Sequence, residues 1–325
     1  MDLLTSTSDY SASDESESAT APATTVQEKP LHPDDIPPFA ATSAAQACIP
    51  IVIAAPHGGR AYTSDLLARM RSPDESTLRL EDRLIDLIAR DVAGSTGAAL
   101  LVANAPRALI DLNRSPDDVD WSMIRGSGAP ARPTRGCNQR ARSGLGLIPR
   151  RLSQVGELWR EPLTARDLMR RVDLVHKPYH ARLAAMLEEL RDRWGTALLV
   201  DLHSMPPLAR RKGEGLCAEF VLGDRYGTSC DPLLSQAVIQ QCATIGRSIL
   251  RNRPYAGGYI LERHGARHRG IHALQLEVCR SIYLDRAMRE TSPRAATVMK
   301  NIADMVTTLS RVLMECLDTQ SGRTI

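Results

Sequence analysis

The sequence predicts an α/β fold with three layers, in which a mixed, largely parallel sheet is flanked by helices. Short apolar runs alternate along the chain with longer amphipathic segments, an order typical of a sheet covered by helices. Three of the apolar runs end abruptly in polar residues. Strands of an open α/β sheet end in this way where a ligand binds at the carboxyl edge.

Five apolar runs are the predicted strands. They span residues 49–55, 98–103, 197–200, 218–222 and 272–277. Apolar runs of about 4–8 residues bounded by turn residues are typical of buried strands. All five lie between residues 48 and 325, which we expect to form a single α/β domain.

The segments between the strands predict helices and two loops. The helices are expected at residues 78–92, 168–194, 231–245 and 292–317. Gly94 is the expected stop of the first helix, and Gly195 that of the second, in which Pro178 predicts an interruption or kink. Residues 116–151 are rich in Gly, Pro and Arg and, like residues 252–259, predict a loop.

The first 47 residues are predicted to form a disordered acidic tail. Residues 1–35 are rich in Ser, Thr, Ala and Pro, with eight acidic residues against one lysine, Lys29. Such a segment buries too little apolar surface to offset the entropy cost of ordering it. Because the chain as a whole carries +3, the part after this −7 segment carries about +10, nearly all of it from arginine.

Composition favours a cytoplasmic protein. The seven cysteines include no C-x-x-C pair, and an odd, scattered set argues against a disulfide framework. Neither a secretory signal nor an apolar run of membrane-spanning length is recognisable, so we expect no membrane partner. The pattern predicts no particular oligomeric state.

Two histidines and a glutamate at the ends of apolar runs predict one shared metal site. His57 follows the run at residues 49–55, His203 follows the run at 197–200, and Glu277 ends the run at 272–277. Two histidines and a carboxylate with an open fourth position are a known ligand set of catalytic zinc. Glu277 is the candidate proton shuttle, since an unpaired glutamate is costly to bury; a salt bridge to Arg280 is the alternative.

Acidic residues near these histidines have two predicted uses. Glu81 and Asp82 follow the first strand on a helix and can reach back to the sheet edge, although acids near a helix N-terminus are also common without a ligand. Asp201 and His203 point to the same side of a strand, so Asp201 can hold the imidazole. Ser204 lies too close in sequence to complete a Ser-His-Asp triad.

Two other histidine groups compete for the metal and are less favoured. His176 and His180 are four residues apart, but Pro178 lies between them and no Glu follows the first His, as it does in H-E-x-x-H zinc helices. The other group is evenly spaced but interrupted by glycines: His264, His268 and His272.

A further polar cluster, Asp111-Leu-Asn-Arg114, predicts substrate binding. Arg114 can contact a substrate carboxylate through two N–H groups, with Asn113 beside it. A structural salt bridge between Arg114 and an acid at the sheet end is the alternative.

These motifs together resemble the N-formylglutamate amidohydrolase family. The resemblance runs from about residue 49 to the closing helix and leaves out the tail. The matching strings are Ala55-Pro-His-Gly-Gly-Arg60, Glu81-Asp82, Pro106-Arg-Ala-Leu-Ile-Asp-Leu-Asn-Arg114, Gly144-Leu-Gly-Leu-Ile-Pro-Arg150, Pro178-Tyr-His180, Asp201-Leu-His-Ser-Met-Pro206, Leu222-Gly-Asp-Arg-Tyr-Gly-Thr-Ser-Cys230, Asn252-Arg-Pro-Tyr-Ala-Gly-Gly-Tyr259 and Leu274-Gln-Leu-Glu-Val-Cys-Arg280. Each string is short, but their number and order make a chance match improbable.

The resemblance implies a fold like that of zinc carboxypeptidases and amidases, with residues 48–325 as a single hydrolase domain. It also implies hydrolysis of N-formyl-L-glutamate to formate and L-glutamate, a late step of histidine degradation. One Zn²⁺ per chain, or another divalent metal, would be held by His57, Asp82 and His203, with Glu81 as the alternate to Asp82.

Roles for the remaining site residues follow from the same hypothesis. Glu277 would take a proton from the attacking water and pass it to the leaving amine. The residues expected to contact this small-molecule substrate and its carboxylates are Arg114, Asn113, Arg280, Arg150 and Tyr259, the last two from loops that close the pocket.

Two other functions stay open at this point. One is a deacylase or amidase of the same fold that acts on another N-acyl amino acid or peptide; the missing export signal argues against a cell-wall substrate. The other is a non-enzymatic nucleic-acid-binding protein, through the seven arginines between Arg125 and Arg151. Because aromatic residues are scarce there, base stacking is weak, and we expect no nucleic-acid partner.

Overall fold

An eight-stranded mixed sheet forms the middle layer of the computed structural model, which describes residues 26–27, 36–126, 139–208 and 217–320. In sheet order the strands are β1 (Val26–Gln27), β2 (Phe39–Ala41), β4 (Ala99–Ala103), β3 (Ile51–Ala55), β9 (Ala197–Met205), β12 (Ile271–Cys279), β10 (Phe220–Gly223) and β11 (Ile249–Arg251). The four central strands, β4, β3, β9 and β12, are parallel to one another. β2 and β10 run antiparallel to their inner neighbours, so the predicted mixed, largely parallel sheet is confirmed.

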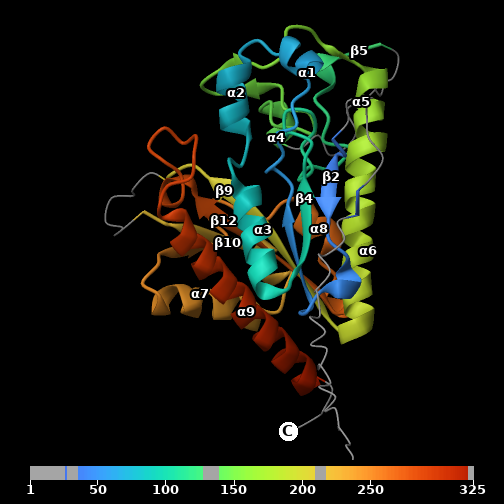
Figure 1. Cartoon of the computed structure of the whole chain (residues 1–325). Helices are drawn as coiled ribbons and strands as arrows, with labels where there is room; N and C mark the ends of the chain where they lie inside the picture. Colours follow the sequence, from blue (N-terminus) through green and yellow to red (C-terminus); the bar gives the residue numbers. More distant parts are fainter. Residues whose placement is uncertain (1–25, 28–35, 127–138, 209–216, 321–325) are drawn as a thin grey trace, which may run out of the picture.

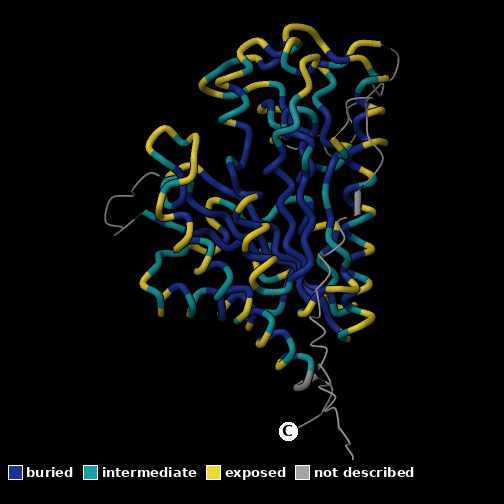
Figure 2. The backbone as a smooth tube through the Cα atoms, in the orientation of Figure 1, coloured by how far each residue is buried: buried dark blue, intermediate teal, exposed yellow. Residues whose placement is uncertain are grey.

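Helices cover both faces of this sheet and complete three layers (Figure 1). One face carries α6 (Lys177–Trp194), and the other carries α3 (Ile85–Thr96), α7 (Pro232–Thr244) and α9 (Ala295–Gln320). Strand residues alternate between the two cores: Ile53 packs on the side of α3 and α9, while its neighbour Ala54 packs on the side of α6. Both faces of the sheet are therefore buried, as Figure 2 shows.

Short elements make up the rest of the described chain. They are η1 (Ala44–Gln46), α1 (Ser64–Ala68), α2 (Pro73–Leu80), η2 (Trp121–Met123), β5 (Ile124–Arg125), α4 (Gln139–Arg142), β6 (Arg151–Leu152), β7 (Gly156–Glu157), β8 (Leu163–Thr164), α5 (Ala165–Arg171), η3 (Val172–His176), η4 (Arg225–Gly227), α8 (Tyr259–His264), η5 (Arg267–Arg269) and η6 (Arg280–Ile282). Within the described ranges, no helix is both long and apolar enough to cross a bilayer.

The single helix predicted over residues 78–92 is wrong, because the chain breaks between α2 and α3. The N–H of Asp82 donates to the carbonyl oxygen of His57 (3.0 Å) instead of continuing a helix. Leu84 takes a left-handed backbone with φ of 57° before α3 begins at Ile85. The break leaves Asp82 facing the carboxyl edge of the sheet. Gly94 is not the stop, since α3 continues to Thr96.

The predicted tail boundary at residue 47 is also corrected. β2 pairs with β4, and the Phe39 side chain is fully buried in the core on the α6 side. Phe39 stacks edge-on against Tyr179 of α6, with ring centroids 5.8 Å apart. The folded body therefore includes β2. Most of the predicted tail, residues 1–25 and 28–35, lies outside the described residues.

Three other expectations are confirmed. The helix predicted at residues 168–194 is interrupted just before Pro178, where η3 forms a π-helical turn, and Gly195 ends it with φ of 79°. The helix predicted at residues 231–245 forms as α7, and the side chain of Asp231 caps it by accepting from the N–H of Leu233. The six cysteines in the described ranges are all free thiols.

Candidate metal centre and active site

A cavity of about 810 Å³ opens at the carboxyl ends of the parallel strands. His57 follows β3, His203 lies near the end of β9, and Glu277 lies near the end of β12. All three line the cavity together with Asp82 from the break between α2 and α3. The structure thus brings together the polar residues that the strand ends predicted.

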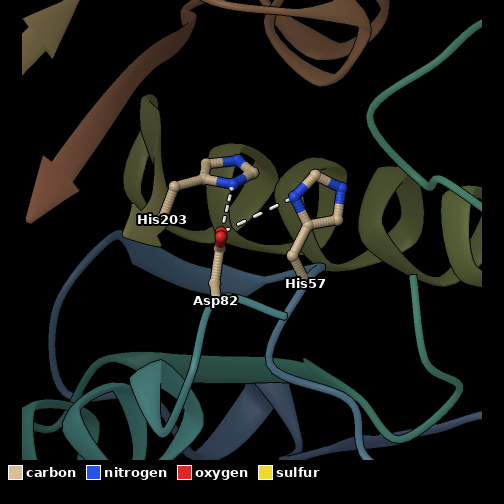
Figure 3. Close-up of side chains that lie close together, drawn as sticks. All are labelled: His57, Asp82 and His203. Carbon is tan, nitrogen blue, oxygen red and sulfur yellow. Dashed lines mark hydrogen bonds and ion pairs between the residues drawn. The ribbon is translucent and has the colours of Figure 1, made fainter. Parts of the chain in front are cut away.

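His57, Asp82 and His203 converge as one group of possible metal ligands (Figure 3). The Nδ1 atom of His203 lies 2.9 Å from Oδ2 of Asp82, and Nδ1 of His57 lies 3.6 Å from the same oxygen. The three ligand atoms lie within 4.8 Å of one another. Among the described residues, no other three His, Cys, Asp or Glu side chains converge in this way.

Local structure explains why His57 points into this site. Its neighbour Gly59 packs directly on the backbone of Ala105, and a Cβ atom on Gly59 would overlap the Ala105 carbonyl group. A Cβ atom on Gly58 would lie only 2.9 Å from the Cβ of Asp86. The two glycines let the chain turn tightly after β3, so the imidazole of His57 projects over the strand ends.

Strand alternation places His203 and Glu277 side by side. In β9, Ala197 and Leu199 pack on the α6 side of the sheet, and Asp201 and His203 continue this row towards the strand end. β12 pairs with β9 in parallel register, and Glu277 stands opposite His203. β9 is longer than predicted: it continues to Met205, so Asp201 and His203 lie within the strand.

The Nε2 atom of each imidazole, on the side of the ring away from Asp82, contacts a buried carboxylate. Nε2 of His57 lies 2.7 Å from Oδ1 of Asp111, and Nε2 of His203 lies 3.0 Å from Oδ2 of Asp201. Because a carboxylate only accepts, each Nε2–H is the donor, and each ring turns its other nitrogen, Nδ1, to Asp82. The predicted contact between Asp201 and His203 is confirmed. Asp111, which the sequence analysis placed in a substrate-binding cluster, has the same role for His57.

The charges of the site favour a cation between the three residues. Burial alone would lower the pKa of His203, but the carboxylates of Asp201 and Asp82 raise it well above its usual range. Burial alone would raise the pKa of Asp82, but hydrogen bonds from His203 and His57 hold it well below its usual range. The surroundings therefore stabilise positive charge beside an ionised Asp82.

Asparagine in place of Asp201 is expected to weaken metal binding by about 10–100-fold. Replacing a carboxylate that accepts a hydrogen bond from a metal-binding imidazole typically lowers the metal affinity by this factor. The amide removes a buried negative charge and accepts a weaker hydrogen bond from His203. Titration with zinc in a competing chelator measures the affinity. Asp117→Asn, which changes an exposed acid on the same cavity, is the matched control. Equal affinities in wild type and Asp201→Asn would contradict this role.

Glu277 is buried, and within the described ranges the ion pair of Arg280 is with Asp82 and not with Glu277, so the salt bridge considered as an alternative does not form. Its Oε1 accepts a hydrogen bond of 2.7 Å from Nε2 of Gln275. Burial and the nearby Asp82 and Asp201 raise its pKa to about 7, against the opposing effects of His203 and Arg107. A carboxyl group with a pKa near neutrality can both accept and return a proton.

Arg114 and Asn113 both line the cavity, in the loop that follows Asp111. Nη1 of Arg114 donates to the carbonyl oxygen of Asn113 (2.7 Å) and Nε to that of Leu145 (3.0 Å). Its Nη2 is buried and has no hydrogen-bond partner among the described residues. Oδ1 of Asn113 accepts from the N–H of Ile260 (2.9 Å), and Nδ2 lies 3.4 Å from Nε2 of His203.

The other predicted contact residues differ in their placement. Tyr259 lines the cavity as the first residue of α8, not from a loop, and its hydroxyl accepts from Arg263. Arg150 is not among the residues lining the cavity, and its guanidinium pairs with Asp120 and Glu157 (both 2.7 Å). The structure therefore does not bring Arg150 to the site.

Arg280 lines the cavity but is occupied by the protein itself. Its Nε donates to Oγ of Ser204 (3.0 Å), and its Nη2 donates to the carbonyl oxygen of Glu81 and lies 3.4 Å from Oδ1 of Asp82. It thus holds the break between α2 and α3. The carboxylate of Glu81 faces Arg83 (3.0 Å), so the structure places Asp82 and not Glu81 in the ligand group.

Sequence reasoning missed three further residues of the cavity. Arg107 is tied to Asp111 by hydrogen bonds of 2.9 Å and helps keep the pKa of that buried acid well below its usual range. Gln275 contacts Glu277, and Tyr255 lines the opening. Strand alternation could have identified Gln275, since it lies two residues before Glu277 and so on the same side of the strand. Arg107 and Tyr255 carried no comparable signal in the sequence.

Comparisons with known proteins give one family. The profile of the N-formylglutamate amidohydrolase family matches residues 49–284. N-formylglutamate deformylase of Pseudomonas putida is 31% identical over 279 residues, which are 84% of this chain and 93% of the relative. The enzyme of the same name from Pseudomonas aeruginosa is 30% identical over 272 residues, 83% of this chain and 92% of the relative.

A solved structure is similar along nearly its whole length. The crystal structure of N-formylglutamate amidohydrolase from Ralstonia eutropha JMP134 has a TM-score of 0.76 and 29% identity, and the match covers 86% of this chain and 99% of that one. The profile, the relatives and this structure agree on the same family. The chain belongs to the N-formylglutamate amidohydrolase family.

Proposed function

We propose that the protein is a zinc-dependent hydrolase that cleaves N-formyl-L-glutamate to formate and L-glutamate. The observation that carries this proposal is the pair of imidazoles whose Nδ1 atoms face one carboxylate oxygen of Asp82, beside the buried Glu277. Relatives named N-formylglutamate deformylase support the substrate. We also propose a cytoplasmic location, supported by the free thiols of the described cysteines.

The ligand group fits zinc. Two imidazole nitrogens and a carboxylate oxygen are ligands that zinc takes in catalytic sites. Tetrahedral ligands at about 2.0–2.1 Å from zinc lie about 3.3 Å apart, between the distances of 2.9 and 3.6 Å from Asp82 to His203 and His57. Zinc in such a site supplies Lewis-acid chemistry, because it polarises a carbonyl oxygen and makes water more acidic.

Glu277 is assigned the proton transfers of the reaction. As the carboxylate it takes a proton from the water that attacks the formyl carbon. As the acid it then returns this proton to the departing amine of glutamate, which cannot leave as an anion. The hydrogen bond from Gln275 holds one oxygen of Glu277 and fixes the carboxylate in place.

Arg114 is assigned the binding of a substrate carboxylate. Its unpaired Nη2 is a buried donor, and a buried donor without a partner is costly until an acceptor arrives. A carboxylate of N-formylglutamate supplies that acceptor with a full negative charge, which roughly doubles the strength of the hydrogen bond. Asn113 lies next to Arg114 and contacts His203, so the carboxylate site lies beside the metal centre.

Formate release from N-formyl-L-glutamate tests the proposal directly. Zinc-loaded protein is expected to release formate and glutamate in equal amounts, and a chelator should reduce the rate to background. N-acetyl-L-glutamate, assayed for glutamate release, is the control for the acyl group. Chelator-resistant turnover would contradict the metal, and release from the acetyl compound alone would move the assignment to another N-acyl amino acid.

A further inference from the structure

Three buried histidines lie behind the wall of the cavity that contains Arg114. His176 ends η3, His180 lies in α6, and His264 ends α8. The rings of His176 and His180 are 4.3 Å apart, and those of His180 and His264 are stacked 5.2 Å apart. None of them belongs to the metal-ligand group.

Two of these histidines bind the backbone of the loop that carries the substrate contacts. Nε2 of His176 lies 2.9 Å from the carbonyl oxygen of Arg114, and Nε2 of His180 lies 3.0 Å from that of Leu112. These two carbonyl groups flank Asn113. The histidines therefore hold the loop on both sides of its cavity-facing amide.

The contacts fix the tautomers of the histidines. A carbonyl oxygen only accepts, so Nε2 of both His176 and His180 carries the proton. In the neutral ring, Nδ1 of His180 is then the acceptor of its 2.9 Å hydrogen bond with Nε2 of His264. A chain of donors thus runs from His264 through His180 to the loop.

The cluster stays neutral at ordinary pH. Burial lowers the pKa of His180 to about 2 and that of His264 to about 3, and the nearby Arg263 acts in the same direction on both. Burial also lowers the pKa of His176, where Arg263 lowers and Asp111 raises it. Because the rings stay neutral, the same ring nitrogens remain hydrogen-bond donors across the pH range in which enzymes usually work.

Helix α8 ties the same loop from the other side. The N–H of Ile260 donates to Oδ1 of Asn113, four residues before His264 in the same helix. The ring of Tyr259 packs against the rings of His180 (5.2 Å) and His176 (5.8 Å). The loop is thus held between α6 and α8, while its Asp111 holds His57.

We propose that His176 and His180 are positioning residues that fix the 111–114 loop and so aim Arg114 at the substrate carboxylate. This inference rests on the proposed function, because it assigns Arg114 the same carboxylate. It predicts that the histidines control substrate binding more than they control the chemical step.

Paired substitutions at His176 test this inference. His176→Leu removes the donor, whereas His176→Gln keeps an N–H in nearly the same place. His176→Leu is expected to raise KM for N-formyl-L-glutamate about tenfold, the effect of one hydrogen bond, with kcat changed less than about threefold. His176→Gln should restore KM to within about threefold of wild type. His268→Leu, at an exposed histidine of η5, is the control for histidine loss.

A double-mutant cycle separates positioning from general destabilisation. In an Arg114→Ala background, His176→Leu should raise KM by less than about twofold more, since the group that it aims is gone. Thermal unfolding sets an assay temperature at which every variant is folded. A wild-type KM in His176→Leu, or a full tenfold effect in the Arg114→Ala background, would overturn the inference.

Hydrogen exchange gives a readout that does not need turnover. Amide exchange in residues 109–115 is expected to accelerate at least about tenfold in His176→Leu and to stay at the wild-type rate in His176→Gln and His268→Leu. If wild-type protein releases no formate, the proposed function fails, and the exchange rates alone decide whether the loop is held. Unchanged exchange in His176→Leu would overturn the positioning role.

Discussion

Replacing Glu277 with glutamine is expected to lower kcat about 10²–10⁴-fold without lowering the affinity for the proposed metal, because the amide cannot transfer the proton that general acid–base catalysis requires. Glutamine keeps the size of the side chain and can still contact Gln275, and Glu277 is not one of the three ligands. Steady-state kinetics and metal analysis of the same preparation measure both quantities. Near wild-type turnover in this variant would remove Glu277 from the reaction.

A matched control is available on the same cavity. Glu262 lines the opening, is exposed and pairs with Arg225 (3.0 Å). Glu262→Gln removes the same charge from the cavity but no proton carrier, so its kcat is expected to stay within about threefold of wild type. A loss as large as that in Glu277→Gln would point to the charge of the cavity in place of proton transfer.

The pH profile offers a second test of Glu277. Burial raises its pKa to about 7, and the base form is the carboxylate, so kcat/KM should fall about tenfold per unit below that pKa. A cation on the three ligands favours the ionised carboxylate, and the acid limb therefore lies at or below pH 7. The residual activity of Glu277→Gln should lack this limb; an unchanged limb would assign it to another group.

Replacing Asp82 with alanine is expected to abolish both metal binding and turnover. The substitution removes a proposed ligand. The loss in metal affinity should therefore exceed the about 10–100-fold loss expected when a carboxylate that only hydrogen-bonds a ligand imidazole is replaced. The substitution also leaves the two Nδ1 atoms of His57 and His203 without the oxygen that they share. Metal content after dialysis and formate release are the measurements.

The neighbouring Glu81 supplies the control for Asp82. Its carboxylate pairs with Arg83 and is not part of the ligand group, although the two acids are adjacent in the sequence. Glu81→Gln should therefore keep its metal. The reverse pattern, with metal lost in Glu81→Gln and kept in Asp82→Ala, would exchange the assigned roles of the two acids.

The strand-end residues were predictable because their signal is local. An apolar run that ends in a histidine or an acid marks the carboxyl edge of a sheet, and parallel register then brings His203 and Glu277 together. Asp201 followed from its two-residue spacing to His203. The family resemblance favoured Asp82 as the third ligand. The residues alone did not distinguish Asp82 from Glu81.

The break that presents Asp82 was not predictable from local pattern. Leu80, Leu84, Leu87 and Ile88 have helical spacing, and nothing between them is a strong helix breaker. The break depends on partners distant in sequence: the carbonyl oxygen of His57, the guanidinium of Arg280 and the hydroxyl of Tyr283. The contacts that Arg280 makes within the protein were likewise not predictable, since they join it to backbone carbonyl oxygens, Ser204 and Asp82.

These distant partners also set the order in which the site can be completed during synthesis. Arg280 and Tyr283 hold Glu81 and Arg83 across about two hundred residues of chain. A nascent chain that has reached Met205 already contains every proposed ligand, but not the residues that hold the turn bearing Asp82. We therefore expect the proposed ligands to reach their final geometry only after β12 and the turn behind it have left the ribosome, so that a metal would bind after almost the whole folded body has been translated.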